Sequence, residues 1–154
     1  MLLTHRTELA KDSPPVRLFA PSGTKNAYFA RFGWAGTGIT APDDKTVWTP
    51  SGNKLTPSTP VTLSWTNAQS QKFEIALSID ENYMITAKQT FTNGGSTPVE
   101  IANFALLSRT GKPADATSGG SIFTHIHIGP MGVFEEKPNY DWGYVDVEEN
   151  KGET

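Results

Sequence analysis

The stretch KFEIALSI, residues 72–79, decides the fold class of this chain. Its apolar side chains recur at every second position, which is the period of a half-buried β-strand rather than of a helix. The apolar positions are Phe73, Ile75, Leu77 and Ile79, and the alternate positions are Lys72, Glu74, Ala76 and Ser78. This segment therefore predicts a strand with one face toward a core.

The segments that follow repeat this pattern. Residues 80–82 (DEN) form a polar turn, and residues 83–91 (YMITAKQTF) alternate again, so the two alternating segments predict a hairpin. Residues 93–98 (NGGSTP) supply turn formers, and residues 99–107 (VEIANFALL) predict a third strand. We expect these three strands to pair in order as an antiparallel meander.

Short stretches rich in aromatic and β-branched residues, bounded by Pro, Gly, Asn or Ser, predict further strands. They are residues 16–21, 26–34, 46–50, 60–67, 121–129 and 131–136. Prolines at 42, 50, 57 and 60 forbid central-strand pairing at those points, so we expect a surface excursion between Trp34 and Val61. Many short strands with almost no helix indicate an all-β chain with a sandwich architecture.

Length and composition narrow the function classes. A chain of 154 residues predicts one domain, residues 1–154. A net charge of −3 without clustered Lys or Arg argues against a nucleic-acid partner. The absence of cysteine excludes disulfides, thiolate catalysis and cysteine zinc sites. No window approaches the roughly 18 apolar residues of a membrane span, so the chain as written is expected to be soluble.

The stretch THIHIGP, residues 124–130, raises the question of a metal site. In a strand, His125 and His127 would project on one face, an arrangement that suits a metal ion. Further ligands are needed, and local spacing supplies none. The same letters fit a structural strand in which Ile126 and Ile128 fill a core and the histidines face outward. We favour this structural interpretation and predict no metal, no cofactor and no catalytic residue.

Other candidate sites are weak. Residues 33–38 (GWAGTG) contain closely spaced glycines but lack the dinucleotide-binding fingerprint, and residues 108–111 (SRTG) lack a nucleophile elbow. Six aromatic residues could line a groove for sugars or peptides, although core packing is the commoner role. They are Tyr28, Phe29, Phe32, Trp34, Trp48 and Trp65.

An ordered set of phrases along the chain resembles one protein family. They are APSGTKNAYFARFGW (20–34), TVWTP (46–50), LTPSTPVTLSWTN (55–67), SIDENYMITAKQTFTN (78–93), LLSRTGKP (106–113) and HIGPMGVF (127–134). Together they resemble the large periplasmic domain of YidC-type bacterial membrane protein insertases of alphaproteobacterial type. The resemblance covers nearly the whole chain.

The resemblance implies an antiparallel β-supersandwich, similar to galactose-mutarotase-like proteins and incomplete at both ends of this chain. It implies a place on the periplasmic face of the bacterial inner membrane, within an integral membrane protein. Nascent membrane proteins and accessory subunits of the Sec translocon are the implied partners. The family often has an acidic residue where Ile128 stands here, which further weakens a His–carboxylate site.

The leading hypothesis is a non-enzymatic domain that aids insertion, folding and assembly of inner-membrane proteins, through partner contacts or a chaperone-like groove. Its expected contact residues are Trp34, Trp48 and Trp142. The alternatives are a carbohydrate-binding module, or a mutarotase-like enzyme that pairs His125 or His127 with a carboxylate. The candidate carboxylates for that enzyme are Glu74 and Glu100.

Overall fold

The computed structural model describes residues 2–6, 9, 11–112 and 127–149. The chain divides into two compact units, residues 1–109 and residues 110–154. Each unit is described by itself below. The expectation of one domain across residues 1–154 stays a prediction.

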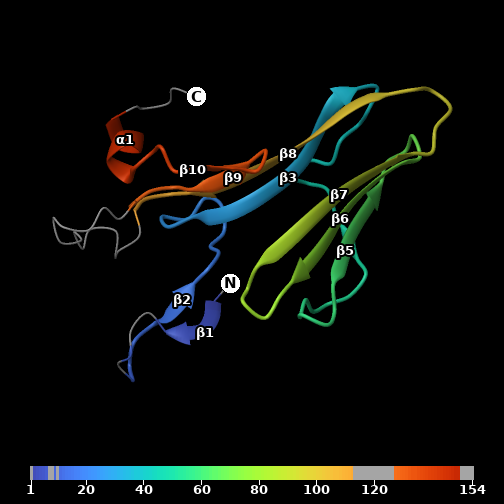
Figure 1. The fold of residues 1–154 in the computed structure, drawn as a ribbon. Coiled ribbons are helices and arrows are strands. Elements are labelled where there is room, and N and C mark those ends of the chain that lie inside the picture. Colours follow the sequence, from blue (N-terminus) through green and yellow to red (C-terminus); the bar gives the residue numbers. More distant parts are fainter. Residues whose placement is uncertain (1, 7–8, 10, 113–126, 150–154) are drawn as a thin grey trace. The chain divides into compact units, whose positions relative to one another are not determined.

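Unit 1 is built of antiparallel strands (Figure 1). A two-stranded sheet pairs β1 with β2, a second pairs β3 with β8, and a four-stranded sheet has the order β4-β5-β6-β7. The strands are β1 (Leu2–Arg6), β2 (Pro15–Arg17), β3 (Tyr28–Thr37), β4 (Thr49–Pro50), β5 (Val61–Thr66), β6 (Gln71–Ile79), β7 (Ile85–Asn93) and β8 (Glu100–Arg109). The expected all-β class is confirmed, and its antiparallel sheets are consistent with a sandwich.

The four-stranded sheet follows the period-two pattern of its sequence. Residues paired across β5, β6 and β7 share a face, so Trp65, Phe73 and Phe91 form one inward row. Phe73 is fully buried, and its ring centroid lies 5.1 Å from that of Phe91. The predicted hairpin of residues 72–79 with the next strand is therefore confirmed.

The core lies between this sheet and the β3–β8 ribbon, the two-stranded sheet of β3 and β8. Trp34 of β3 meets Phe73 edge to face, with ring centroids 5.2 Å apart. Trp34, Phe73 and Ile75 are its buried centre. Partly buried neighbours complete it: Phe32, Ile39, Trp48, Leu63, Trp65, Leu77, Ala87, Phe91 and Ile101.

The expected three-stranded meander is wrong. Strand β8 does not join the four-stranded sheet. It pairs with β3 over ten residues, from Tyr28 opposite Arg109 to Thr37 opposite Glu100. The connection after β7, residues 94–99, is long enough to carry the chain across to the other sheet. Local alternation predicts a strand but does not choose its partner, and here a long-range pairing decides.

Strand β7 begins two residues later than residue 83, where the sequence pattern predicts it. Tyr83 has a φ of 65° and belongs to the turn. The carboxylate of Asp80 accepts hydrogen bonds from the backbone N–H groups of Asn82 and Met84, both at 2.8 Å. This side-chain cap lengthens the turn at the expense of the strand.

Unit 2 contains a small hairpin and a short helix. Strand β9 (Gly132–Phe134) pairs with β10 (Lys137–Asn139), which confirms a strand within residues 131–136. Helix α1 (Tyr144–Glu149) was not expected from the sequence. Asp146 accepts a hydrogen bond from the Gly143 N–H at 2.7 Å, half of a capping box. Residues 121–126 of another predicted strand lie outside the described residues.

The helical part of the described chain offers no segment of the length and apolarity needed to span a membrane.

Candidate functional site

The histidine that opened the question of a metal site makes local contacts. His127 lies outside any strand, and its Nε2 is 3.1 Å from the carbonyl oxygen of Pro130. Its ring centroid is 6.1 Å from that of Tyr140. Within residues 2–6, 9, 11–112 and 127–149, no group of three or more potential ligands is placed to hold a metal ion. His125 lies outside the described residues.

The three predicted contact tryptophans fall into different environments. Trp34 is 7% exposed in the core, so a partner would reach its indole only if the sheets separated. Trp48 stacks on Trp34 at 6.3 Å and is half-buried. Trp142 belongs to unit 2 and is 43% exposed. The structure therefore brings Trp34 and Trp48 together, and the contact role of all three stays a prediction.

The six candidate groove aromatics do not share one surface. Phe32 and Trp65 pack against the core. Tyr28 lies under the guanidinium of Arg109, 5.0 Å from the ring centroid. Phe29 follows Tyr28 in β3 and so points to the opposite face of the ribbon.

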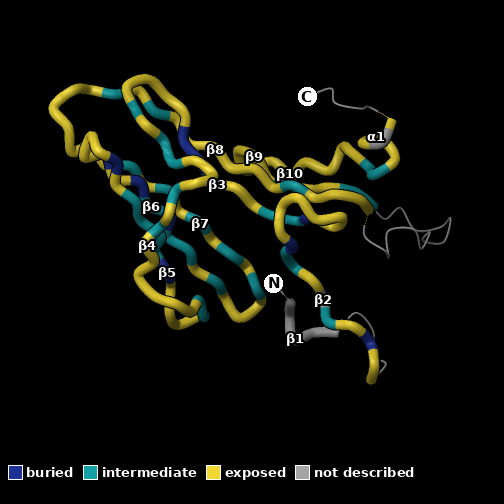
Figure 2. Tube along the Cα trace, turned by 180° about the vertical axis from the view of Figure 1, so that it is seen from behind, coloured by how far each residue is buried: buried dark blue, intermediate teal, exposed yellow. Residues whose placement is uncertain are grey.

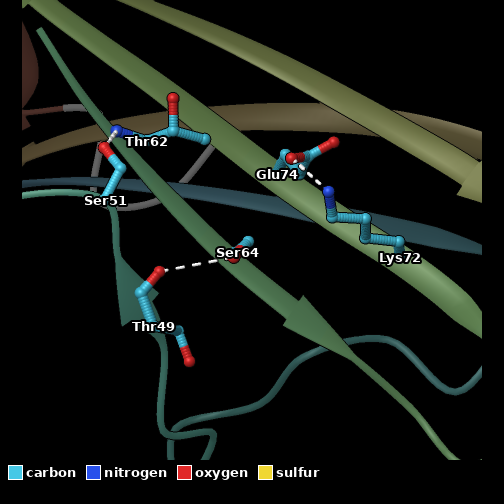
Figure 3. Close-up of polar contacts among 6 residues, drawn as sticks. All are labelled: Thr49, Ser51, Thr62, Ser64, Lys72 and Glu74. Atoms are coloured by element: carbon cyan, nitrogen blue, oxygen red, sulfur yellow. Dashed lines mark hydrogen bonds and ion pairs between the residues drawn. The ribbon is translucent and has the colours of Figure 1, made fainter.

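The two candidate carboxylates of the mutarotase alternative lie on different sheets of unit 1. Glu74 lies on β6, where its carboxylate forms an ion pair with Lys72 at 2.7 Å (Figure 3). Glu100 begins β8, in the two-stranded β3–β8 sheet, where it pairs with Thr37.

The outer face of the four-stranded sheet is polar. Glu74 stands between Ser64 on β5 and Thr90 on β7. Close-up contacts on this side join hydroxyl groups to backbone, such as the Ser51 hydroxyl oxygen accepting from the Thr62 N–H at 2.9 Å (Figure 3). Such a surface is compatible with water and does not call for a protein partner.

The outer face of the β3–β8 ribbon carries apolar residues between polar ones, with Arg31 directly opposite Leu106. The cross-strand register places five apolar residues on the side that faces away from Trp34 and Phe32. We call these residues the outer ribbon face: Phe29, Ala35, Ala102, Phe104 and Leu106. Phe104 is 43% exposed and Leu106 is 48% exposed, although burial of large apolar side chains normally stabilises a fold.

A glycine shapes this face. Gly33 stands directly opposite Phe104, and the phenyl ring folds over it. A Cβ at Gly33 would lie 2.8 Å from Phe104 Cε1, closer than carbon atoms tolerate. The absence of a side chain at Gly33 therefore leaves room for the Phe104 ring over the ribbon.

The second feature of the ribbon is an open strand edge. β3 is the only strand partner of β8 among the described residues (Figure 1). Among the described residues, no strand pairs with the other edge of β8 (Glu100–Arg109), and an unpaired edge offers backbone groups for strand addition. Exposed tube segments along β8 in Figure 2 show how little of this strand is covered.

Sequence reasoning missed the outer ribbon face. A usable signal was present in residues 99–107, which contain apolar side chains at odd and at even positions. Ile101 and Leu107 would lie on one face of a strand, and Phe104 and Leu106 on the other. A strand that is apolar on both faces is typical of one that is covered on both faces.

Comparisons with known proteins give a consistent result. The family model described as YidC periplasmic domain matches residues 1–154. The insertase YidC of Zymomonas mobilis is 40% identical over 96% of this chain and 24% of that protein. The YidC protein of Nitrobacter hamburgensis is 40% identical over 98% of this chain and 25% of that protein. The YidC protein of Rickettsia bellii is 33% identical over 99% of this chain and 27% of that protein. All three are named membrane protein insertases.

The chain thus spans about a quarter of the length of the curated relatives it matches. No solved structure matches it, so the galactose-mutarotase-like label stays a prediction. The relatives give the sugar-enzyme alternative no support. A family match over the full chain, together with relatives of up to 40% identity, shows that this chain belongs to the YidC periplasmic domain family.

Proposed function

We propose that this chain is the periplasmic portion of a membrane protein insertase and serves there as a non-enzymatic partner-binding domain. Through it, the parent protein would contact nascent inner-membrane proteins and accessory subunits of the Sec translocon. The relatives' names support the insertase assignment. The observation that carries the binding role is the outer ribbon face beside the open edge of β8.

The physical basis is the contrast between the two outer faces of unit 1. Ser64, Glu74 and Thr90 present a hydrated surface, whereas Phe104 and Leu106 leave apolar area in water. Covering that area with a partner gains about 25 cal/mol for each Å² of apolar surface buried. An extended segment paired along β8 would add main-chain hydrogen bonds to this gain.

Between partner contacts and a chaperone-like groove, the ribbon favours partner contacts, because Phe104 and Leu106 are exposed side chains on one face of β8. Trp142 offers a second exposed aromatic side chain. Trp34 and Trp48 would contribute indirectly, by holding β3 against the four-stranded sheet.

Site-specific photocrosslinking tests the binding role in cells. A photoreactive phenylalanine analogue replaces Phe104 or Leu106 in the full-length parent protein, and crosslinked partners are identified by mass spectrometry. The matched controls are Thr62 and Thr90 on the polar outer face. We expect crosslinks to Sec accessory subunits or nascent membrane proteins from the ribbon positions only. Equal yields from ribbon and control positions would refute the role of this face.

Fractionation of source cells tests the location separately. An antibody against this chain should detect a membrane-embedded protein well above 16.7 kDa, and protease added to intact spheroplasts should cleave it. A soluble protein of the chain's own mass would overturn the insertase assignment.

A further inference from the structure

Unit 2 carries a second surface, of which the proposed function uses only Trp142. Its hairpin and the segment after it expose five large apolar side chains. We call them the hairpin surface: Met131 (71% exposed), Val133 (70%), Phe134 (68%), Tyr140 (59%) and Trp142 (43%). Exposed apolar side chains are common singly, but five within twelve residues are unusual in a monomer.

The described part of unit 2 that carries this surface has an acidic sequence. Residues 127–149 hold a single basic side chain, Lys137. Against it stand six acidic side chains: Glu135, Glu136, Asp141, Asp146, Glu148 and Glu149. Residues 1–109, in contrast, hold ten basic and eight acidic side chains. Negative charge is therefore concentrated in the unit that exposes the hairpin surface.

The two acidic residues at the tip of the hairpin are held in an unusual backbone conformation. Phe134 pairs with Lys137, which leaves Glu135 and Glu136 as a two-residue loop with φ values of 51° and 65°. Asn-Gly or Asp-Gly sequences fill such loops most readily. Here the loop displays two neighbouring carboxylates next to Phe134 instead.

We propose that the hairpin surface of unit 2 binds an apolar, positively charged polypeptide segment. Its apolar side chains bury those of Met131 and Val133, while Phe134 projects from the opposite face of β9. Its Lys or Arg groups pair with the tip carboxylates. Negative charge beside the apolar side chains disfavours an anionic lipid surface. It also disfavours the same surface of a second copy, because like charges would meet.

A binding titration with the 154-residue chain tests this proposal. The probe is a fluorescent peptide of about 18 residues, leucine and lysine patterned as an amphipathic helix. Its counterpart replaces every lysine with glutamate. We expect the lysine peptide to bind at least about tenfold more tightly, and its affinity to fall as salt rises. Equal affinity for the two peptides would overturn the proposal.

Variants locate the binding to the hairpin. Replacing both tip carboxylates (E135Q with E136Q) should weaken binding about threefold to tenfold and reduce its salt dependence. Val133→Thr, which keeps the side-chain shape, should also weaken binding. Glu81→Gln, at the β6–β7 turn, and Val47→Thr, 83% exposed, are the matched controls in unit 1 and should bind as the unchanged chain does. Circular dichroism verifies the fold of every variant.

Two further outcomes would overturn the proposal. In the first, the tip and Val133 variants bind the lysine peptide as tightly as the unchanged chain. In the second, the chain and the tip variant bind vesicles of zwitterionic phosphatidylcholine equally well, and Val133→Thr abolishes that binding. This result would assign the hairpin surface to a lipid membrane.

Discussion

At the scale of single residues, the core depends on a group of aromatic rings around Phe73. Trp34, Trp65 and Phe91 surround it, with ring centroids 5.2, 5.7 and 5.1 Å away. Each contact joins a different strand to β6. Removing the central ring would therefore loosen both sheets at once.

Phe73→Ala is expected to lower the free energy of unfolding by about 3–5 kcal/mol, because it leaves a cavity that the surrounding rings cannot fill. Urea denaturation followed by tryptophan fluorescence measures the change. Phe73→Leu keeps most of the volume and should remain folded if the alanine variant does not. Phe134→Ala, at an exposed ring, should change stability by less than about 0.5 kcal/mol. Equal losses from the Phe73 and Phe134 variants would contradict this account of the core.

Gly33→Ala is expected to destabilise unit 1 by up to about 1 kcal/mol, because the added methyl group displaces the outer end of the exposed Phe104 ring. In a chain that already carries Phe104→Ala, the same glycine substitution should cost much less. The double-mutant cycle, measured by chemical denaturation, isolates this coupling. Additive effects would show that the ring does not rest on Gly33.

A buried polar pair fixes the end of the β5–β6 turn. Asn67 donates to the Gln71 Oε1 at 2.7 Å, and Gln71 donates through Nε2 to the Gly38 carbonyl oxygen at 2.8 Å. Asn67 also donates to the Thr40 carbonyl oxygen at 3.0 Å. These bonds attach the loop after β3 to the other sheet.

Gln71→Ala should lower the free energy of unfolding by about 1–3 kcal/mol, because it removes the bond to the Gly38 carbonyl oxygen and leaves one N–H of the buried Asn67 amide without its acceptor. Thermal denaturation measures the change, and Gln69→Ala on the exposed side of the same turn is the control. If the two variants lose equal stability, the polar pair does not contribute as described.

At the scale of elements, the β9–β10 hairpin has a turn sequence that suits it poorly. Glu135→Asn together with Glu136→Gly should stabilise the hairpin, because αL geometry costs an ordinary residue roughly 1–2 kcal/mol. Amide hydrogen exchange of Val133 and Asn139 should slow by at least about tenfold. Unchanged exchange would show that the turn is not under strain. The same substitutions should lower the affinity of the chain for the lysine peptide, since they remove both carboxylates.

Other elements show where local patterns suffice. The alternation of residues 72–79 predicts β6 within one residue, because one face of that strand meets a core and the other meets water. The start of β7 moved because Asp80 caps the turn through its side chain. Helix α1 is too short for its periodicity to show in the sequence, and the Asp146 cap that begins it lies within an acidic run.

At the scale of the whole molecule, the outer ribbon face should drive self-association when no partner is present. Analytical ultracentrifugation of the 154-residue chain should show assemblies that grow with concentration, because apolar area and an open strand edge favour pairing between chains. Leu106→Lys should shift the chain toward the monomer. Thr90→Lys, on the polar outer face, should leave association unchanged. A chain that stays monomeric at every concentration would contradict the role given to the ribbon.

The sequence by itself determined the strand content, the period-two core pattern and, by resemblance, the family, because all three are written in neighbouring residues and ordered phrases. It predicted the structural role of the THIHIGP region only in part, since His127 makes local contacts but lies outside any strand. Tertiary structure alone decided that β8 pairs with β3, that Trp34 is buried against Phe73, and that Phe104 and Leu106 share an exposed face. The two kinds of feature differ in the separation along the chain of the residues that decide them. Alternation involves near neighbours, whereas the choice of strand partner depends on packing between distant residues, such as Gly33 and Phe104.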